Sequence, residues 1–210
     1  MPDVWSAVHA ERCALIDDLA PLTDQQWEVP SLASGWSVHD VAAHLVDNAL
    51  TTPARLLRAM IAARFDFDGQ NANGVAAAKG AIPAETLDRL RAVTDRRTGP
   101  PTFLAAVESR IVEEIAHGED IRRALGIERA YPPEAVAAAL AYQAKTPESM
   151  GGARSLVGRV TLVADDADLR LGQGPQVRGP ALALLMLATG RRHALGELSG
   201  AGVALVDVPT

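Results

Sequence analysis

Two stretches of the chain carry the side chains best suited to chemistry. The first, GWSVHDVAAHL (35–45), places His44 within an amphipathic helical pattern. The second, ESRIVEEIAHGEDIRRALG (108–126), places Glu113 and His117 four residues apart, so both side chains project from one face of a helix about a turn apart. Two imidazoles and one carboxylate form the ligand set of an open divalent metal site, with the fourth position left for water or substrate.

Ordinary structural roles are also open to these residues. His44 could be a polar residue at the edge of its helix, and a Glu–His pair at this spacing stabilises a surface helix by roughly a few tenths of a kcal/mol. Apolar neighbours place part of the second stretch near a core, where a buried carboxylate needs a partner such as a metal. Glu114, at an offset of three from His117, competes with Glu113 as the carboxylate, although an offset of four is the better match. Spacing by itself leaves the metal site and the structural roles both open.

Composition excludes several classes of function. The chain has 210 residues, of which 48% are hydrophobic and 22% charged, as is ordinary for a globular protein. A net charge of −6 argues against nucleic acid as a partner, because neutralising phosphates needs a basic face. The longest apolar run, PALALLMLATG, is shorter than the ~20 residues of a membrane span, and no charged-then-apolar leader opens the chain. The single cysteine, Cys13, excludes an internal disulfide and a cysteine-rich zinc site. We therefore expect a cytoplasmic protein that binds neither nucleic acid nor membrane.

Helical patterns dominate the first part of the chain. We expect four helices, at 4–19, 37–63, 83–95 and 103–125. Gly, Asn and Asp residues predict a turn-rich break at 65–74. Ser37 followed by Asp40 is an acidic variant of the capping box, and Gly126 suits the end of the last helix. Four helices joined by loops predict a four-helix bundle, in which metal sites are commonly assembled from facing helices.

The pattern changes after Gly126, where a smaller α+β domain is expected. We predict a helix at about 134–144, a strand in SLVGRVTLVAD (155–165), a second strand in DLRLGQGPQVRG (168–179) that ends in a Gly/Pro-rich turn, a buried helix at 180–191 and a closing strand in VALVDV (203–208). The predicted fold class is therefore α+β, with a helical domain at 1–128 and a small α+β domain at 129–210.

The two chemistry-bearing stretches together resemble the mycothiol-dependent maleylpyruvate isomerase family of DinB-like metalloproteins. The later LVADDADLRLGQGPQVRGPALALLMLATGR and GELSGAGVALV are similar to the small C-terminal domain of that family. The resemblance implies a DinB-like four-helix bundle that binds a divalent metal, usually zinc, through His, Glu and His. Carried onto this chain, the ligands are His44, Glu113 and His117, and His39 is not expected to be a ligand.

The resemblance also implies an enzymatic function. It points to mycothiol as a small-molecule cosubstrate for isomerisation or S-transfer on a small, electrophilic and anionic substrate. Arg191 resembles an arginine that the isomerases direct toward the metal cleft, where its planar fork could bind a substrate carboxylate. A helix C-terminal charge is the alternative role for Arg191, and Arg178 is a weaker candidate of the same kind. We expect the chain to act as a monomer or a homodimer.

Asp120 and Trp36 also lie near the predicted ligands in the sequence. Asp120, three residues past His117, could hold an imidazole N–H and fix its tautomer, or it could be an ordinary helical acid. Trp36 is expected to anchor the loop before its helix.

Two other functions stay open. One is a metal-binding protein without thiol chemistry, in which His9 or Asp47 closes the site as a fourth ligand. The other is metal-assisted hydrolysis, with Glu114 or Asp40 as the base for a metal-bound water.

Overall fold

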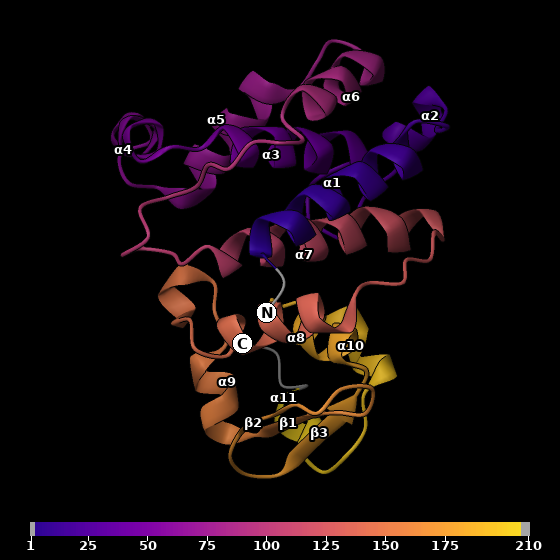
Figure 1. The fold of residues 1–210 in the computed structure, drawn as a ribbon, viewed down its shortest axis with the longest axis vertical. Coiled ribbons are helices and arrows are strands. Elements are labelled where there is room, and N and C mark those ends of the chain that lie inside the picture. Colours follow the sequence, from indigo (N-terminus) through magenta and orange to yellow (C-terminus); the bar gives the residue numbers. More distant parts are fainter. Residues whose placement is uncertain (1–2, 207–210) are drawn as a thin grey trace. The chain divides into compact units, whose positions relative to one another are not determined.

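A computed structural model describes residues 3–206 and divides them into two compact units. The first unit, Asp3–Arg129, is helical, and the second, which begins at Ala130, adds a small sheet to its helices (Figure 1). The predicted fold class, a helical bundle with a small α+β domain, is confirmed. Within residues 3–206, no helix is both long enough and apolar enough to cross a membrane.

Four helices form the centre of the first unit: α1 (Val4–Leu19), α3 (Val38–Leu50), α6 (Pro83–Ala92) and α7 (Glu108–Leu125). Helix α1 contacts α7, α7 contacts α3, α3 contacts α6 and α6 contacts α1, so the four close into a bundle (Figure 1). Their shared core contains buried apolar side chains that include Leu15, Leu19, Val41, Leu45, Leu90 and Ile121. Within Asp3–Arg129, the shorter helices α2 (Asp24–Trp27), α4 (Pro53–Ala62) and α5 (Phe67–Ala78) complete the unit.

The predicted capping box begins helix α3. The Ser37 hydroxyl accepts a hydrogen bond from the Asp40 amide at 3.2 Å, and the Asp40 carboxylate accepts one from the Ser37 amide at 2.9 Å. Lys79 Nζ donates to the other carboxylate oxygen at 2.8 Å. Burial would raise the pKa of Asp40, but the Lys79 and Ser37 donors hold that pKa below its ordinary value of 3.8.

Replacing Asp40 with alanine is expected to lower the free energy of unfolding by about 1–2 kcal/mol at pH 7, because the reciprocal bond of the capping box and the ion pair with Lys79 are both lost. The folded-state pKa of Asp40 lies below its unfolded value, so its stabilisation is present above pH ~4 and is lost as the pH falls through the folded-state pKa. Urea unfolding at pH 7 and at about pH 3.5 should therefore show a smaller difference between wild type and variant at the lower pH. Asp17→Ala, at an exposed position of α1, is the control; an equal difference at both pH values would contradict the prediction.

The second predicted helix does not continue to residue 63. Helix α3 ends at Leu50, and α4 starts at Pro53 with Thr52 as its N-cap. Proline has no N–H to donate to a preceding turn, and it disfavours a helical conformation at the residue before it. One expected helix is therefore two.

The predicted break at 65–74 is also wrong, because Phe67–Ala78 forms helix α5. This helix packs on α3 and buries Val75 and Ala78. Gly74 permits the close approach, since a Cβ atom there would clash with the carboxylate of Asp47. Packing against α3 thus outweighs the weak helix propensity of the Gly- and Asn-containing segment.

Helix α7 begins at Glu108 rather than at Phe103, whose side chain is 85% exposed and so gains no core contacts to support a helix there. Its predicted end is confirmed, since Gly126 adopts a left-handed conformation with φ of 68°. The helix therefore reaches from the loop after residue 100 through both predicted ligands to a glycine cap.

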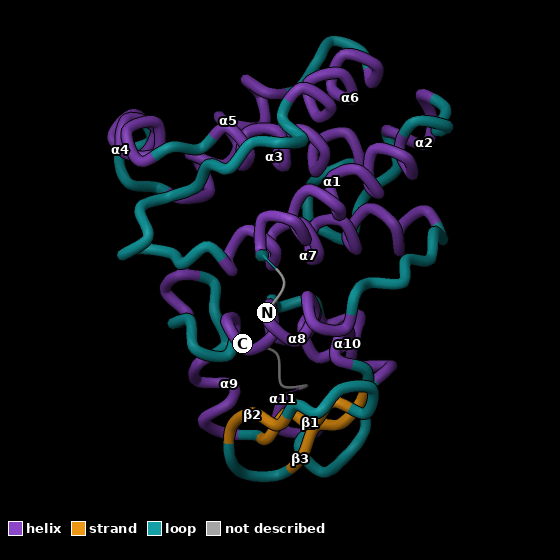
Figure 2. The backbone as a smooth tube through the Cα atoms, in the orientation of Figure 1, coloured by secondary structure: helices purple, strands orange, loops and turns teal. Residues whose placement is uncertain are grey.

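The second unit combines helices with a three-stranded sheet within its described residues, 130–206. Its helices are α8 (Pro133–Gln143), η1 (Glu148–Met150), α9 (Arg154–Arg159), α10 (Ala181–Ala188), η2 (Arg192–Glu197) and α11 (Val203–Val206). The sheet has the order β2 (Arg170–Gly172), β1 (Thr161–Ala164), β3 (Gln176–Gly179), with β1 antiparallel to β2 and parallel to β3 (Figure 2). Helix α10 is the predicted buried helix: all its residues except Leu182 are buried, and it packs on α8 and on strands β1 and β3.

Three strand predictions in this unit need correction. The strand expected over 155–165 is confined to 161–164, because Arg154–Arg159 forms α9. Residues 176–179, expected in a turn, form β3 and pair with β1. Val203–Val206, expected as a strand, forms α11, and the remainder of that predicted strand lies outside the described residues. Branched side chains favour strands only where the neighbouring chain offers pairing partners, and the local pattern does not reveal those partners.

Candidate metal centre

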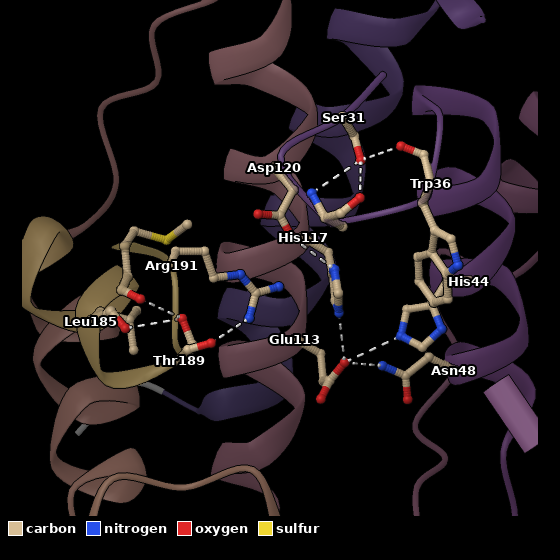
Figure 3. Close-up of polar contacts among 12 residues, drawn as sticks. Ser31, Trp36, His44, Asn48, Glu113, His117, Asp120, Leu185, Thr189 and Arg191 are labelled. Atoms are coloured by element: carbon tan, nitrogen blue, oxygen red, sulfur yellow. Dashed lines mark hydrogen bonds and ion pairs between the residues drawn. The ribbon is translucent and has the colours of Figure 1, made fainter. Parts of the chain in front are cut away.

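Glu113 lies at the centre of a polar cluster formed by α3 and α7. Its Oε2 lies 3.5 Å from Nε2 of His44 and 3.5 Å from Nε2 of His117. His44 comes from α3, whereas Glu113 and His117 share one face of α7, as their spacing predicts. Figure 3 shows the three side chains pointing toward one another, and one candidate ligand atom from each lies within 4.8 Å of the others.

Both nitrogen–oxygen separations in this cluster fit a small divalent ion. Ligands at zinc-like distances of about 2.1 Å in a tetrahedral arrangement lie about 3.4 Å apart, close to both nitrogen–oxygen separations here. The side chains of His44 and His117 are 11% and 15% exposed, and that of Glu113 is 33% exposed. Three protein donors that are mostly withdrawn from water leave one tetrahedral position for a small molecule.

The charge state of Glu113 suits a metal ligand. Burial would raise the pKa of this carboxyl, but hydrogen bonds from His117 and His44 hold the pKa well below its ordinary value of 4.5. The carboxylate is therefore ionised at neutral pH. An imidazole donates to Glu113 through a proton on its ring nitrogen. A divalent ion bound to that nitrogen would take the place of the proton, so metal binding is expected to release protons.

Asp120 contacts the His117 ring, which is one of the two roles that its spacing left open. Oδ2 of Asp120 lies 3.1 Å from Nδ1 of His117, and the aspartate is fully buried. The contact favours a proton on Nδ1, so Nε2 is the nitrogen from which a bound metal would displace the proton.

Replacing Asp120 with asparagine is expected to weaken metal binding by about 10–100-fold, because the charge that orients the His117 ring and raises its basicity is lost. Competition between the protein and a chromophoric chelator for Zn²⁺ measures this change. Glu119→Gln serves as the control, since Glu119 lies on the same helix and pairs with Arg123 at 2.7 Å. Equal affinities for wild type and Asp120→Asn would show that the aspartate has only a packing role.

Trp36 forms an aromatic wall beside the two imidazoles. Its ring lies 5.0 Å from that of His44 and 6.3 Å from that of His117, measured between ring centroids. The loop that carries it is attached to α7 through the Leu32 amide, which donates to the Asp120 carbonyl at 3.0 Å. The sequence predicts only that Trp36 anchors this loop. Its position against both histidines depends on the packing of the loop on α7, which no local spacing reveals.

Asn48 and Arg110 also join the cluster, and sequence reasoning missed both. Asn48 donates to Glu113 Oε2 at 3.1 Å and accepts a hydrogen bond from Arg110 (Figure 3 shows the first of these contacts). The available signal was the position of Asn48, one helical turn after His44 on the same face of α3.

The rival acidic residues are held elsewhere. Glu114 faces α1, where its Oε1 accepts from Arg12 Nε at 2.7 Å, and it is 4% exposed. Asp40 completes the capping box of α3 and pairs with Lys79. The two acids considered as bases for hydrolysis are thus committed to structural ion pairs, and the structure favours Glu113 over Glu114 as the carboxylate of the cluster.

The remaining histidines and the alternative fourth ligands also have other surroundings. His39 Nε2 lies 2.7 Å from the Thr86 hydroxyl, and burial lowers the pKa of this histidine. Asp47 pairs with Arg55 at 2.6 Å. Among residues 3–206, the candidate metal-binding group contains neither His9 nor Asp47.

The two arginine candidates belong to the second unit. Arg191 lies three residues after the end of α10, and its Nη1 donates to the Thr189 carbonyl at 2.9 Å (Figure 3). Arg178 lies on β3 and pairs with Asp165 at 2.6 Å. The contact of Arg191 with a substrate carboxylate stays a prediction.

Comparison with known proteins agrees with this architecture. Residues 8–109 match the model of the mycothiol maleylpyruvate isomerase N-terminal domain. This match places a domain of the mycothiol maleylpyruvate isomerase family in the helical unit of the chain. The matched region includes His44 and ends before Glu113 and His117. The assignment of these two as candidate ligands therefore rests on their positions in the structure.

Two crystal structures are similar to the chain over most of its length: that of the mycothiol-dependent maleylpyruvate isomerase and that of a His-to-Ala mutant of it. Each has a TM-score of 0.58 and 16% sequence identity, over 98% of this chain and 93% of the other. At this identity the likeness shows a shared fold. A search of curated proteins finds no sequence that matches the chain.

Proposed function

We propose that this chain is a divalent-metal-dependent enzyme, with zinc as its ion, that uses mycothiol as a cosubstrate for isomerisation or S-transfer on a small, anionic electrophile. The observation that supports this most is the convergence of His44, Glu113 and His117 in a chain whose residues 8–109 match the N-terminal domain of mycothiol maleylpyruvate isomerase. Imidazole and carboxylate ligands suit zinc, and three of them leave a position open for a cosubstrate.

The residues of the helical unit would hold the metal and shape its surroundings. His44, Glu113 and His117 would be its ligands, and Asp120 would keep the His117 ring in the orientation that binding needs. Trp36 would cover one side of the two imidazoles and limit the access of water. When bound, the divalent ion supplies Lewis acidity that favours the thiolate form of a thiol.

The thiol itself is proposed to come from a small molecule. Cys13 is the only cysteine of the chain; it is exposed on α1 and does not belong to the candidate metal-binding group. A single, non-participating cysteine is consistent with a cosubstrate that delivers the nucleophilic sulfur, and with a reducing, cytoplasmic location.

The domain after residue 128 is proposed to supply substrate contacts. Arg191 would bind a carboxylate of the substrate, since its guanidinium presents two parallel N–H donors. A shared fold can carry different reactions, so the substrate has to be identified from the site rather than from the family.

Metal analysis and thermal unfolding together test the proposal. We expect mass spectrometry of untagged protein to find about one zinc ion per chain, and we expect mycothiol to raise the melting temperature of the zinc-loaded protein only. Glutathione at the same concentration is the control for an unspecific thiol effect. Zinc without a response to mycothiol would favour a metal-binding protein without thiol chemistry, and absence of metal after reconstitution would overturn the proposal.

A further inference from the structure

Asn48 and Arg110 connect the candidate metal centre to the interior of the helical unit. Asn48 Nδ2 donates to Oε2 of Glu113 at 3.1 Å, and Arg110 Nη1 donates to Oδ1 of Asn48. Arg110 lies nearly a turn before Glu113 on α7 and is only 8% exposed. Its Nε donates to the Ser109 hydroxyl at 3.2 Å, so the guanidinium is held on two sides.

The contact with Arg110 determines which way the Asn48 amide faces. A guanidinium can only donate hydrogen bonds, so the atom of Asn48 that meets it must be the carbonyl oxygen. The NH₂ group is then the end of the amide that faces Glu113. Without Arg110 the amide could rotate by half a turn and present its oxygen to the carboxylate, which would repel it.

Glu113 has particular need of such support. Its side chain is 33% exposed, whereas the His117 ring is 15% exposed and contacts the buried Asp120. A glutamate side chain has three rotatable bonds, and holding one of its oxygens between two imidazoles costs conformational entropy. A fixed donor on that oxygen reduces the number of competing orientations before a ligand arrives.

We propose that Asn48, oriented by Arg110, is a positioning residue that fixes Oε2 of Glu113 as a metal ligand. The hydrogen bond is compatible with metal binding, because a carboxylate oxygen has a second lone pair for the ion. This inference rests on the proposed function, since it assumes that the ligands described above bind a metal. Together with Asp120 on His117, it gives two of the three ligands a hydrogen-bonding partner that holds them in place.

Titration with Zn²⁺ and Co²⁺ in competition with a chelator tests the role of Asn48. Asn48→Ala is expected to lower the affinity for either ion by about 10–100-fold, and to shift the visible absorption of the Co²⁺ protein because Glu113 binds in a different orientation. Asn48→Leu keeps the volume of the side chain, removes the donor and is expected to give the same loss. Asn73→Ala is the matched control, since Asn73 is exposed on α5.

A second variant separates orientation from charge. Arg110→Lys keeps a positive charge near Glu113 but cannot reproduce the forked donor, so a loss of several-fold in affinity is expected. Because Arg110 is proposed to act through Asn48, the double variant Asn48→Ala/Arg110→Lys should bind no more weakly than Asn48→Ala alone.

Three outcomes would overturn the inference. The first is a folded Asn48→Leu or Asn48→Ala protein with wild-type affinity and an unchanged Co²⁺ spectrum. The second is fully additive losses in the double variant, which would show that Arg110 acts on Glu113 directly. The third is a wild-type protein that binds neither ion, which would overturn the proposed function as well; the first two leave that function standing.

Discussion

Replacing His44 with alanine is expected to abolish divalent-metal binding. His44 is the only candidate ligand on α3, and the two that remain, Glu113 and His117, come from a single turn of α7. Two ligands on one helix bind a divalent ion more weakly than three ligands from two helices. The metal content should therefore fall from about one ion per chain to almost none. Mass spectrometry after dialysis against metal-free buffer measures the change, and the mycothiol response should disappear with the metal.

The control for this experiment is His193→Ala, which removes a histidine from the second unit and should leave the metal content unchanged. Far-UV circular dichroism establishes whether the His44→Ala protein keeps its helices. A folded His44→Ala protein that retains its full metal content would show that His44 is a packing residue beside Trp36 and that the metal is bound elsewhere.

Replacing Arg12 with methionine is expected to lower the free energy of unfolding of the helical unit by about 3–5 kcal/mol. The Arg12 and Glu114 side chains are 2% and 3% exposed, and their ion pair spans 2.7 Å between α1 and α7. Burial raises the pKa of Glu114 and the charge of Arg12 lowers it, so removal of Arg12 leaves a buried carboxyl without its compensating charge. Arg12 also donates to the carbonyl oxygens of Val93, Thr94 and Arg96 after α6, and those acceptors would lose their partner.

Tryptophan fluorescence during urea unfolding measures this loss. All three tryptophans of the chain lie in the helical unit, so the signal reports on that unit. Arg91→Met is the control: Arg91 makes a surface ion pair with Asp88, and its loss should change the free energy of unfolding by less than about 1 kcal/mol. The double variant Arg12→Met/Glu114→Leu should recover part of the lost stability, because no buried charge is left unpaired. Similar losses for Arg12→Met and Arg91→Met would contradict the prediction.

Local features of the chain determined the start of α3, the end of α7 and the spacing of two of the three candidate ligands. The Ser37 and Asp40 side chains cap a helix through bonds that span three residues, and Gly126 ends one through its own backbone conformation. Glu113 and His117 lie on one face of α7 because they are four residues apart, which is about one helical turn. These relations involve only a turn or two of backbone, so sequence alone is sufficient to predict them.

Only the tertiary structure decided which neighbours those helices have. It turned Glu113 toward His44 and its neighbour Glu114 toward Arg12, a choice that depends on how α7 lies between α1 and α3. It also made a helix of residues 67–78, because packing against α3 supplies the stability that Gly and Asn residues lack locally.

The supporting residues of the site were decided in the same way. Trp36 reaches the imidazoles because its loop is attached to α7, and Asn48 meets Glu113 across the interface of two helices that are far apart in sequence. The sequence determined which residues can bind a metal and how those on one helix are spaced. The packing of α3 against α7 decided which of them meet, because contacts between distant segments depend on the burial of the whole core and not on any local pattern.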